Sequence, residues 1–302
     1  MKILITGTMR TGGTLLINSL SLSKKIVIFN ERLNYFRFIF EKYKKINKKN
    51  LLQIIEELSL RLKYRQSIRI NKRAILKNLK NKELNHSNLF DAIQMYFLKK
   101  YNVKKSIWGE YANLTWNYIP NFLELFNDGK VVIIVRDPRA ILSSFKKITF
   151  LKKKLYLNAI FNWLDLLFFL KNLKKRKIKD KCLITSFESL HRNPKKELKR
   201  ICSFLNIKYE NKMSSNKEHK RLDPKKIKIN ISSFSNKLVH GFSTKRINNW
   251  KNYLENWEIF LCDKLCKKYY KEYKYVEHNF SRLEKIKLNK IIKTNFENNE
   301  YL

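Results

Sequence analysis

Residues 7–16 read Gly7-Thr8-Met9-Arg10-Thr11-Gly12-Gly13-Thr14-Leu15-Leu16, and the apolar run Ile3-Leu4-Ile5 stands directly before them. The order is a short buried strand, a loop that contains glycines, and a segment whose apolar residues recur at helical spacing. Glycines let successive backbone N–H groups converge on one point, and the following helix N-terminus adds unsatisfied donors and the positive end of its dipole. The stretch therefore predicts a strand–loop–helix unit that binds a phosphate-like anion, to which Arg10 adds a cation and Thr14 a hydroxyl.

The loop differs from that of the nucleotide triphosphatases at one position. In the pattern G-x-x-x-x-G-K-[ST], Gly7, Gly12 and Thr14 are in place, but Gly13 stands where the lysine belongs. Kinases and ATPases need that lysine on the β- and γ-phosphates. The departure favours an anion other than a magnesium-bound triphosphate. On this loop alone, a tight turn without a ligand remains the alternative.

Length and composition predict one large α/β domain. The chain has 302 residues, of which 44% are hydrophobic, which is enough to bury a substantial core. The formal net charge is +41, but the lysines are scattered through almost every segment instead of forming one stripe or tail. This distribution favours a compositional bias with solvated lysines over a nucleic-acid interface. The positive field is still expected to draw anions towards the clefts of the molecule.

The sequence also predicts a cytoplasmic protein. It contains no uninterrupted apolar run of about twenty residues, so we expect no membrane span. The first expected strand begins at Lys2, which leaves no room for a signal peptide. The four cysteines include no C-x-x-C pair, and we expect neither disulfides nor a metal site from them.

Further apolar runs predict the other strands of a parallel sheet, and polar residues follow several of them. Glu31 comes just after the strand expected at 25–29, and Arg136 directly follows the β-branched run 130–135. Parallel-sheet proteins keep their chemistry at the carboxyl ends of the strands, so Glu31 is a candidate general base. On its own, a lone carboxylate at this place is more often an exposed loop residue. Arg136 and Ser144, two turns into the next helix, can converge on one phosphate monoester. Two more strands are expected, ending near Glu110 and Thr185.

The rest of the chain is expected to be helical or to form loops. Residues 35–101 predict two or three helices that cover the mouth of the site, and 155–173 predict an apolar core helix. Residues 211–249 are polar and lack periodicity, which predicts a long loop around the cleft. The last expected helix runs to about Tyr273. We therefore predict one domain over 1–302, with a helical insertion around 35–101 and a cleft-covering loop around 211–249.

Taken together, these segments resemble the sulfotransferases that use 3′-phosphoadenosine 5′-phosphosulfate (PAPS) as donor, including bacterial members. The family loop [KR]-[ST]-G-[TG]-T, which binds the 5′-phosphosulfate, is matched by Arg10-Thr11-Gly12-Gly13-Thr14. The family strand end R-D-P-R, with a serine eight residues after its first arginine, binds the 3′-phosphate and is matched by Arg136 and Ser144. The resemblance implies a three-layer, P-loop-like α/β fold with a central parallel sheet flanked by helices.

Later segments extend the resemblance. Phe187-Glu188-Ser189-Leu190 is similar to the family's Y-E-D-L, with Phe187 in place of a tyrosine near the nucleotide. A phenylalanine keeps the ring for stacking but lacks the hydroxyl. Lys245 and Arg246, ahead of Trp250, resemble the basic loop that closes over the 3′-phosphate, although the family's glycine is absent. The resemblance thus assigns donor binding to Arg10, Thr11, Gly12, Gly13, Thr14, Leu15, Arg136, Ser144, Phe187, Lys245 and Arg246.

The base is assigned from the same comparison. The stretch Trp108-Gly109-Glu110-Tyr111-Ala112-Asn113 lacks both the histidine of cytosolic small-molecule members and the lysine of W-G-[DE]-K-[ST]-P in many bacterial ones. Protein-tyrosine and carbohydrate-type members instead place a glutamate soon after the phosphosulfate loop, where Glu31 stands. We expect Glu31 to be the catalytic base, with Arg10 as the catalytic cation, while Glu110 and His240 are the competing candidates.

The implied reaction is direct in-line transfer of a sulfuryl group from PAPS to an acceptor hydroxyl, or an amine. The acceptor is expected to be a carbohydrate or small metabolite, 3′-phosphoadenosine 5′-phosphate (PAP) is the other product, and no metal is implied. Two alternatives remain: a P-loop kinase, which needs magnesium, and a basic protein that binds RNA or membrane surfaces without catalysis.

Overall fold

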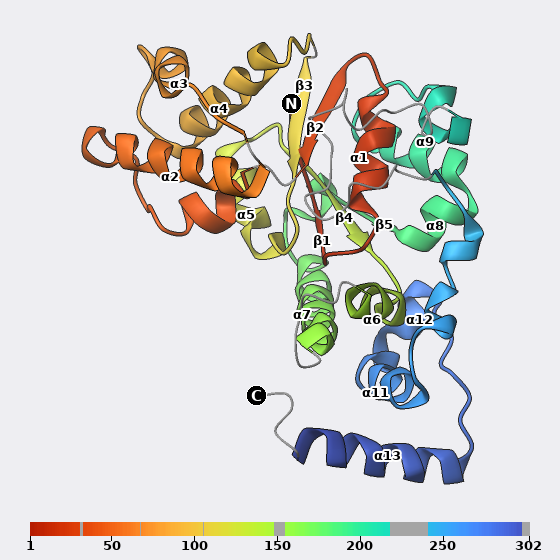
Figure 1. The fold of residues 1–302 in the computed structure, drawn as a ribbon. Helices are drawn as coiled ribbons and strands as arrows, with labels where there is room; N and C mark the ends of the chain where they lie inside the picture. The colour runs from red at the N-terminus through yellow and green to blue at the C-terminus, as the bar shows by residue number, and fades with distance from the viewer. Residues whose placement is uncertain (31–32, 67, 105, 148–154, 218–240, 298–302) are drawn as a thin grey trace.

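The computed structural model describes residues 1–30, 33–66, 68–104, 106–147, 155–217 and 241–297. Within these ranges five strands form one parallel sheet in the order β2-β3-β1-β4-β5 (Figure 1). The α/β fold with a central parallel sheet flanked by helices is confirmed. The strands are β1 (Lys2–Gly7), β2 (Ile26–Asn30), β3 (Ile107–Tyr111), β4 (Lys130–Val135) and β5 (Cys182–Ser186).

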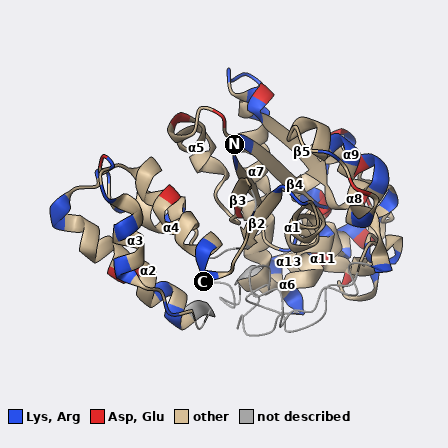
Figure 2. Cartoon of the chain, turned by 90° about the horizontal axis from the view of Figure 1, so that it is seen from above, with Lys and Arg blue, Asp and Glu red and all other residues tan. Residues whose placement is uncertain are grey.

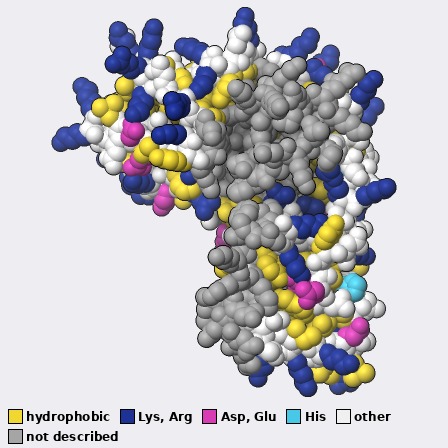
Figure 3. All heavy atoms as spheres, viewed as in Figure 1, with side chains coloured by type: hydrophobic (Ala, Val, Ile, Leu, Met, Phe, Trp, Pro, Cys, Tyr) yellow, Lys and Arg dark blue, Asp and Glu magenta, His cyan; other side chains and the backbone are white. Residues whose placement is uncertain are grey.

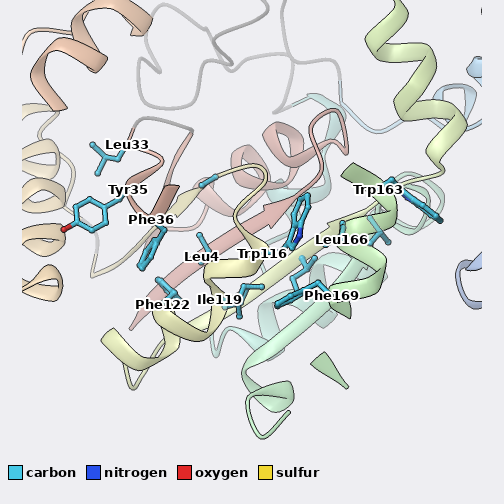
Figure 4. Close-up of a cluster of buried hydrophobic side chains, with 14 of the residues drawn as sticks. Leu4, Leu33, Tyr35, Phe36, Trp116, Ile119, Phe122, Trp163, Leu166 and Phe169 are labelled. Carbon is cyan, nitrogen blue, oxygen red and sulfur yellow. The ribbon is translucent and has the colours of Figure 1, made fainter. Parts of the chain in front are cut away.

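The sheet is apolar on both faces, as parallel strands between two helical layers must be. Ile3 and Ile5 of β1 pack on one face with α1 (Gly13–Ser21) and α9 (Pro194–Phe204). Leu4 points to the other face, which is covered by α5 (Ile119–Leu125) and α7 (Asn158–Leu173). Figure 4 shows this second layer, where Phe122, Trp163 and Phe169 lie over the sheet.

The segment expected as two or three helices contains three α-helices and a short π-helix. They are α2 (Lys48–Gln66), α3 (Lys72–Leu79), α4 (His86–Lys100) and the π-helix Phe36–Phe40, and they stand together at one side of the sheet (Figure 1). Asn71 and Asn85 begin α3 and α4, because each side chain accepts a hydrogen bond from the backbone three residues on. That this segment is an insertion covering the site stays a prediction.

Helices at the carboxyl edge of the sheet and beyond it complete the fold. Pro138 begins α6, where Asp137 accepts the backbone N–H of Arg139 and so caps the helix. A final helix, which the sequence did not predict, is α13 (Arg282–Glu297), and it packs on α11 (Asn256–Cys266) at the far end of the molecule (Figure 1). These helices are α6 (Pro138–Lys146), α8 (Phe187–Arg192), α11 (Asn256–Cys266), α12 (Tyr270–Tyr273) and α13 (Arg282–Glu297).

Basic side chains are spread over the molecule. In Figure 2, Lys and Arg lie on helices at both ends of the sheet, and Figure 3 shows them around the outline of the face seen there, with few acidic residues between them. Within the described part of the chain, no helix has both the length and the apolar character to cross a membrane. Most of the loop expected at 211–249 lies outside the described residues.

Candidate functional site

The loop after β1 has the backbone shape of an anion-binding loop. Arg10 and Gly12 have φ of 68° and 86°, and Gly12 precedes the first turn of α1. Left-handed residues in such a loop turn successive N–H groups to one side, and a non-glycine residue there costs about 1–2 kcal/mol. Among the residues that the structure describes, no side chain caps α1. The first N–H groups of α1 are therefore left for an anion.

Two aromatic rings pack against the glycines of this loop. A Cβ on Gly12 would stand 2.7 Å from Cδ2 of Phe187, and a Cβ on Gly13 would stand 2.1 Å from Cζ of Tyr111. From the sequence, anion binding alone was expected to account for these glycines. Close approach of Phe187 from α8 and of Tyr111 from β3 is a second reason why no side chain fits there.

Four of the predicted donor-binding residues meet at the carboxyl edge of the sheet. The Arg10 side chain donates through Nε to the Ser144 hydroxyl at 2.9 Å. Arg136 donates through Nη1 to the backbone oxygen of Arg10 at 2.8 Å and through Nη2 to that of Arg246 at 3.4 Å. Segments more than 100 residues apart in the chain thus gather two guanidinium groups, a hydroxyl and the backbone of Arg246 around the loop.

The Arg136 side chain is half-buried with its Nε enclosed, yet its guanidinium remains a cation at neutral pH. Burial lowers its pKa to about 10, and the nearby carboxylates of Glu188 and Asp137 limit that fall. Its Nε has no hydrogen-bond partner within the described ranges. Because buried polar groups are almost always paired, this donor marks a place for an acceptor that the described residues do not supply.

Phe187 lies at the centre of this cluster. Its ring is 5% exposed, with the Arg136 guanidinium 3.8 Å from its centroid and the His191 ring 4.0 Å away, tilted by 32°. A nucleotide base would have to displace one of them to stack on Phe187. His191 was not predicted from the sequence, although its position four residues after Phe187 on α8 places the two rings on one helix face.

Comparison with known proteins identifies the chain. A family model described as "Sulfotransferase family" matches residues 2–211. The chain belongs to the sulfotransferase family. The family predicted from the motifs is confirmed, and with it the enzyme class, which is the transfer of a sulfuryl group. No curated protein matches this sulfotransferase in sequence.

Solved structures share the fold at low sequence identity. A sulfotransferase domain from the curacin biosynthetic pathway superposes with a TM-score of 0.60 at 18% identity, covering 91% of this chain and 98% of that one. The sulfotransferase domain of the Synechococcus PCC 7002 olefin synthase gives 0.55 at 16%, covering 88% and 93%. Mouse sulfotransferase SULT7A1, complexed with PAP, gives 0.53 at 13%, covering 97% and 88%. The likeness spans nearly the whole of this sulfotransferase.

The structure describes one of the three candidate bases. Glu31 and His240 lie outside the described residues. Glu110, at the end of β3, is 1% exposed, and its Oε1 accepts the backbone N–H groups of Leu33 at 2.9 Å and Asn34 at 2.8 Å. Burial raises the pKa of this carboxyl to about 7. Glu110 therefore fixes the backbone that follows β2.

Three other predicted donor-binding residues, Leu15, Thr11 and Lys245, lie outside the cluster of Arg10, Ser144 and Arg136. Leu15 packs into the core beneath the loop, and its N–H donates to the oxygen of Gly12. The Thr11 hydroxyl donates to the backbone oxygen of Thr8 at 2.9 Å and so stabilises the loop itself. Lys245 is exposed on the 3-10 helix Thr244–Arg246. The contacts of Leu15 and Thr11 leave the backbone of the loop, rather than these two side chains, facing an anion.

The second arginine of the R-D-P-R motif has a structural role. Arg139 is 2% exposed and pairs with Asp137 at 2.7 Å and with Asp263 of α11 at 3.2 Å. It also donates to the backbone oxygen of Val276 at 2.8 Å, and its guanidinium lies 4.3 Å from the Trp250 ring. Within the motif, Arg136 thus belongs to the candidate site, whereas Arg139 attaches the C-terminal helices to α6.

Proposed function

We propose that this sulfotransferase moves a sulfuryl group from PAPS to an acceptor hydroxyl by direct in-line transfer, with PAP as the second product. The observation that carries the proposal is the convergence of Arg10, Ser144 and Arg136 on the loop after β1. Two of these residues come from the segment 136–144, which follows the strand next to β1. A nucleotide with phosphate groups at both its 5′ and 3′ positions fits two adjacent basic sites.

The residues present fit such a nucleotide. Buried polar atoms without a partner in the described part of the chain lie in or next to the loop: Oγ1 of Thr8, Nε of Arg136 and Nε2 of His191. All three can donate a hydrogen bond, and phosphate oxygens are strong acceptors. Donors of this kind, with cations around them, support an anionic ligand.

The proposed roles follow from the contacts. The loop N–H groups of 11–14, with Arg10 and the Thr14 hydroxyl, hold the 5′-phosphosulfate, and Arg136, Ser144, Lys245 and Arg246 hold the 3′-phosphate. When bound, PAPS supplies the activated sulfuryl group. Arg10 stabilises the charge that develops on the bridging oxygen, and the fixed loop keeps the reacting atoms aligned. Because Ser144 accepts from Arg10 and keeps its own hydroxyl proton to donate, it links the two sites.

For the base, we propose Glu31, which takes the proton of the acceptor hydroxyl. The carboxyl of Glu110 is already engaged by two backbone N–H groups, which favours a positioning role for it. The match of Glu31 to the carbohydrate and protein-tyrosine branches supports a carbohydrate or small-metabolite hydroxyl as acceptor.

The geometry of the loop argues against the kinase alternative. A kinase lysine at position 13 would carry its Cβ into the Tyr111 ring, 2.1 Å from Cζ. The loop therefore has no room for the side chain that engages the β- and γ-phosphates in P-loop kinases.

Calorimetric titration with PAP, AMP and magnesium ATP tests the proposal. We expect PAP to bind without magnesium and more tightly than AMP, because Arg136 and Ser144 meet a phosphate only in PAP. Arg136→Ala should lower PAP affinity by about 2–3 kcal/mol, as expected for a lost charge-assisted pair. Ser144→Ala, which leaves the Arg136 cation in place, should cost less. Equal curves for PAP and AMP would contradict the proposal.

A further inference from the structure

We propose that His191 binds the sulfuryl donor: its Nε2–H group joins Arg136 and Arg246 in a site made of hydrogen-bond donors that receives the 3′-phosphate of the nucleotide. This inference rests on the proposed function and names a residue that neither the motifs nor the comparisons assign.

The proton of His191 is placed by its hydrogen bond. The backbone N–H of Ser243 donates to Nδ1 at 2.8 Å, so Nδ1 acts as the acceptor and the neutral ring carries its proton on Nε2. Burial, together with the positive charges of Arg246 and Arg136, lowers the pKa of His191 to about 4. The ring is therefore neutral at physiological pH and presents one N–H donor.

That donor has no partner among the residues described. The side chain is 3% exposed, and Nε2 is buried without a hydrogen bond. An unpaired buried donor costs free energy, and native proteins rarely leave one without a structural or functional reason. Burying His191 against Phe187 with its Nε2–H unpaired is explained if a ligand supplies the acceptor.

The groups around His191 indicate what that ligand is. Arg136 and Arg246 are close enough to depress its pKa, and Nε of Arg136 is itself unpaired in the described structure. The carboxylate of Glu188, which acts on Arg136, already accepts the backbone N–H of Asp137 at 3.0 Å and the Tyr275 hydroxyl at 3.3 Å. The site thus combines two cations with one neutral hydrogen-bond donor, and the Glu188 carboxylate is engaged elsewhere. These groups favour an anion with several acceptor oxygens, such as a phosphate monoester.

The position of His191 also compensates for a change in the motif. Phe187 lacks the hydroxyl that the family's tyrosine places near the nucleotide. His191 lies against the Phe187 ring on the same helix and restores a polar hydrogen to this neighbourhood. Its Nδ1 meanwhile fixes Ser243, three residues before Arg246. A role limited to this backbone tether is the competing explanation.

Two substitutions separate the roles of the two ring nitrogens. In His191→Asn, Oδ1 takes the place of Nδ1 and keeps the acceptor for Ser243, but the distal donor is lost. In His191→Gln, the amide N–H reaches the position of Nε2, but the proximal acceptor is lost. Both variants and the natural protein are titrated with PAP and AMP. We expect His191→Asn to lose at least tenfold in its preference for PAP over AMP, whereas His191→Gln stays within a few-fold of the natural protein.

A control variant separates the effect of His191 from a general loss of positive charge on this helix. Arg192→Gln removes an exposed charge one residue along the helix and should change PAP and AMP affinities equally. If His191→Asn keeps the preference for PAP, or if both variants lose it equally, the inference is overturned. A natural protein that does not prefer PAP at all would instead overturn the proposed function.

A measurement on the unsubstituted protein covers the case in which a variant fails to fold. With histidine ring nitrogens labelled with 15N, PAP should shift the Nε2–H resonance of His191 downfield and slow its exchange with water, and AMP should not. A resonance that responds equally to both nucleotides would refute the contact with the 3′-phosphate.

Discussion

Replacing Glu110 with glutamine should make the protein more stable at high pH relative to the natural chain. Burial raises the pKa of the Glu110 carboxyl from its ordinary value of 4.5 to about 7. Between these pH values the folded state holds a proton that the unfolded state has released. The stability contribution of Glu110 is therefore largest below pH 4.5, falls as the pH rises, and levels off above 7. At 1.36 kcal/mol per unit, the shift corresponds to about 3 kcal/mol.

Glutamine keeps the shape of the site and removes the titration. Its amide oxygen can replace Oε1 as acceptor for Leu33 and Asn34, while its NH2 takes the place of Oε2, which has no partner in the described residues. The cost of that unpaired group is the same at every pH. The free energy of unfolding of Glu110→Gln minus that of the natural protein should thus rise by about 3 kcal/mol between pH 4.5 and 8.

Urea denaturation of both proteins at several pH values measures this difference, in which the other titrating groups cancel. Glu124→Gln, on the exposed side of α5, controls for the loss of one negative charge from a chain of formal net charge +41. A difference that stays constant with pH would show that the site accepts the ionised carboxylate, and the reasoning from burial would be refuted.

Three further predictions concern the loop and the reaction. Gly13→Ala should destabilise the protein by about 1–3 kcal/mol in urea denaturation, because its Cβ would overlap the Tyr111 ring, and Tyr111→Leu should relieve part of that loss; additive effects of the two changes would contradict the clash. Arg10→Gln should abolish sulfuryl transfer in a labelled-donor assay and leave PAP binding within a few-fold, whereas a parallel collapse of PAP affinity would make Arg10 a ground-state anchor. Glu31→Gln should lower kcat by about 10²–10⁴ with donor affinity unchanged, and Glu110→Gln should lower it much less; the reverse ranking would move the base to Glu110.

The fold and the order of its motifs were readable from the sequence, because they depend on local patterns. Each strand is a short apolar run, and residues such as Arg136 come directly after one, so the topology of parallel strands brings them to one edge. The family resemblance then gave the loop and the R-D-P-R strand end their expected ligands.

Contacts between distant segments were not readable. The pairing of Arg10 with Ser144 spans 134 residues, and the bond from Ser243 to His191 spans 52. No periodicity reports the approach of Tyr111 to Gly13, which depends on the register of β1 and β3. The last helix, α13, was missed because Leu283, Ile286 and Ile291 are exposed and blur the amphipathic pattern. Among its described side chains Leu288 is buried and Ile292 is partly buried.

The network around Arg139 has a consequence for where this enzyme can be divided. The region recognised by the family model ends at residue 211, yet Arg139 at the start of α6 takes its second counter-ion and a backbone acceptor from Asp263 and Val276. A protein that ended at residue 211 would keep the buried Arg139 guanidinium and its partner Asp137 but lose Asp263. Losing one partner of a buried ion pair costs about 3–5 kcal/mol. The part of the chain that must stay together for stability therefore extends beyond the region that the family model matches. Domain swaps or fusions should preserve the chain at least through Val276.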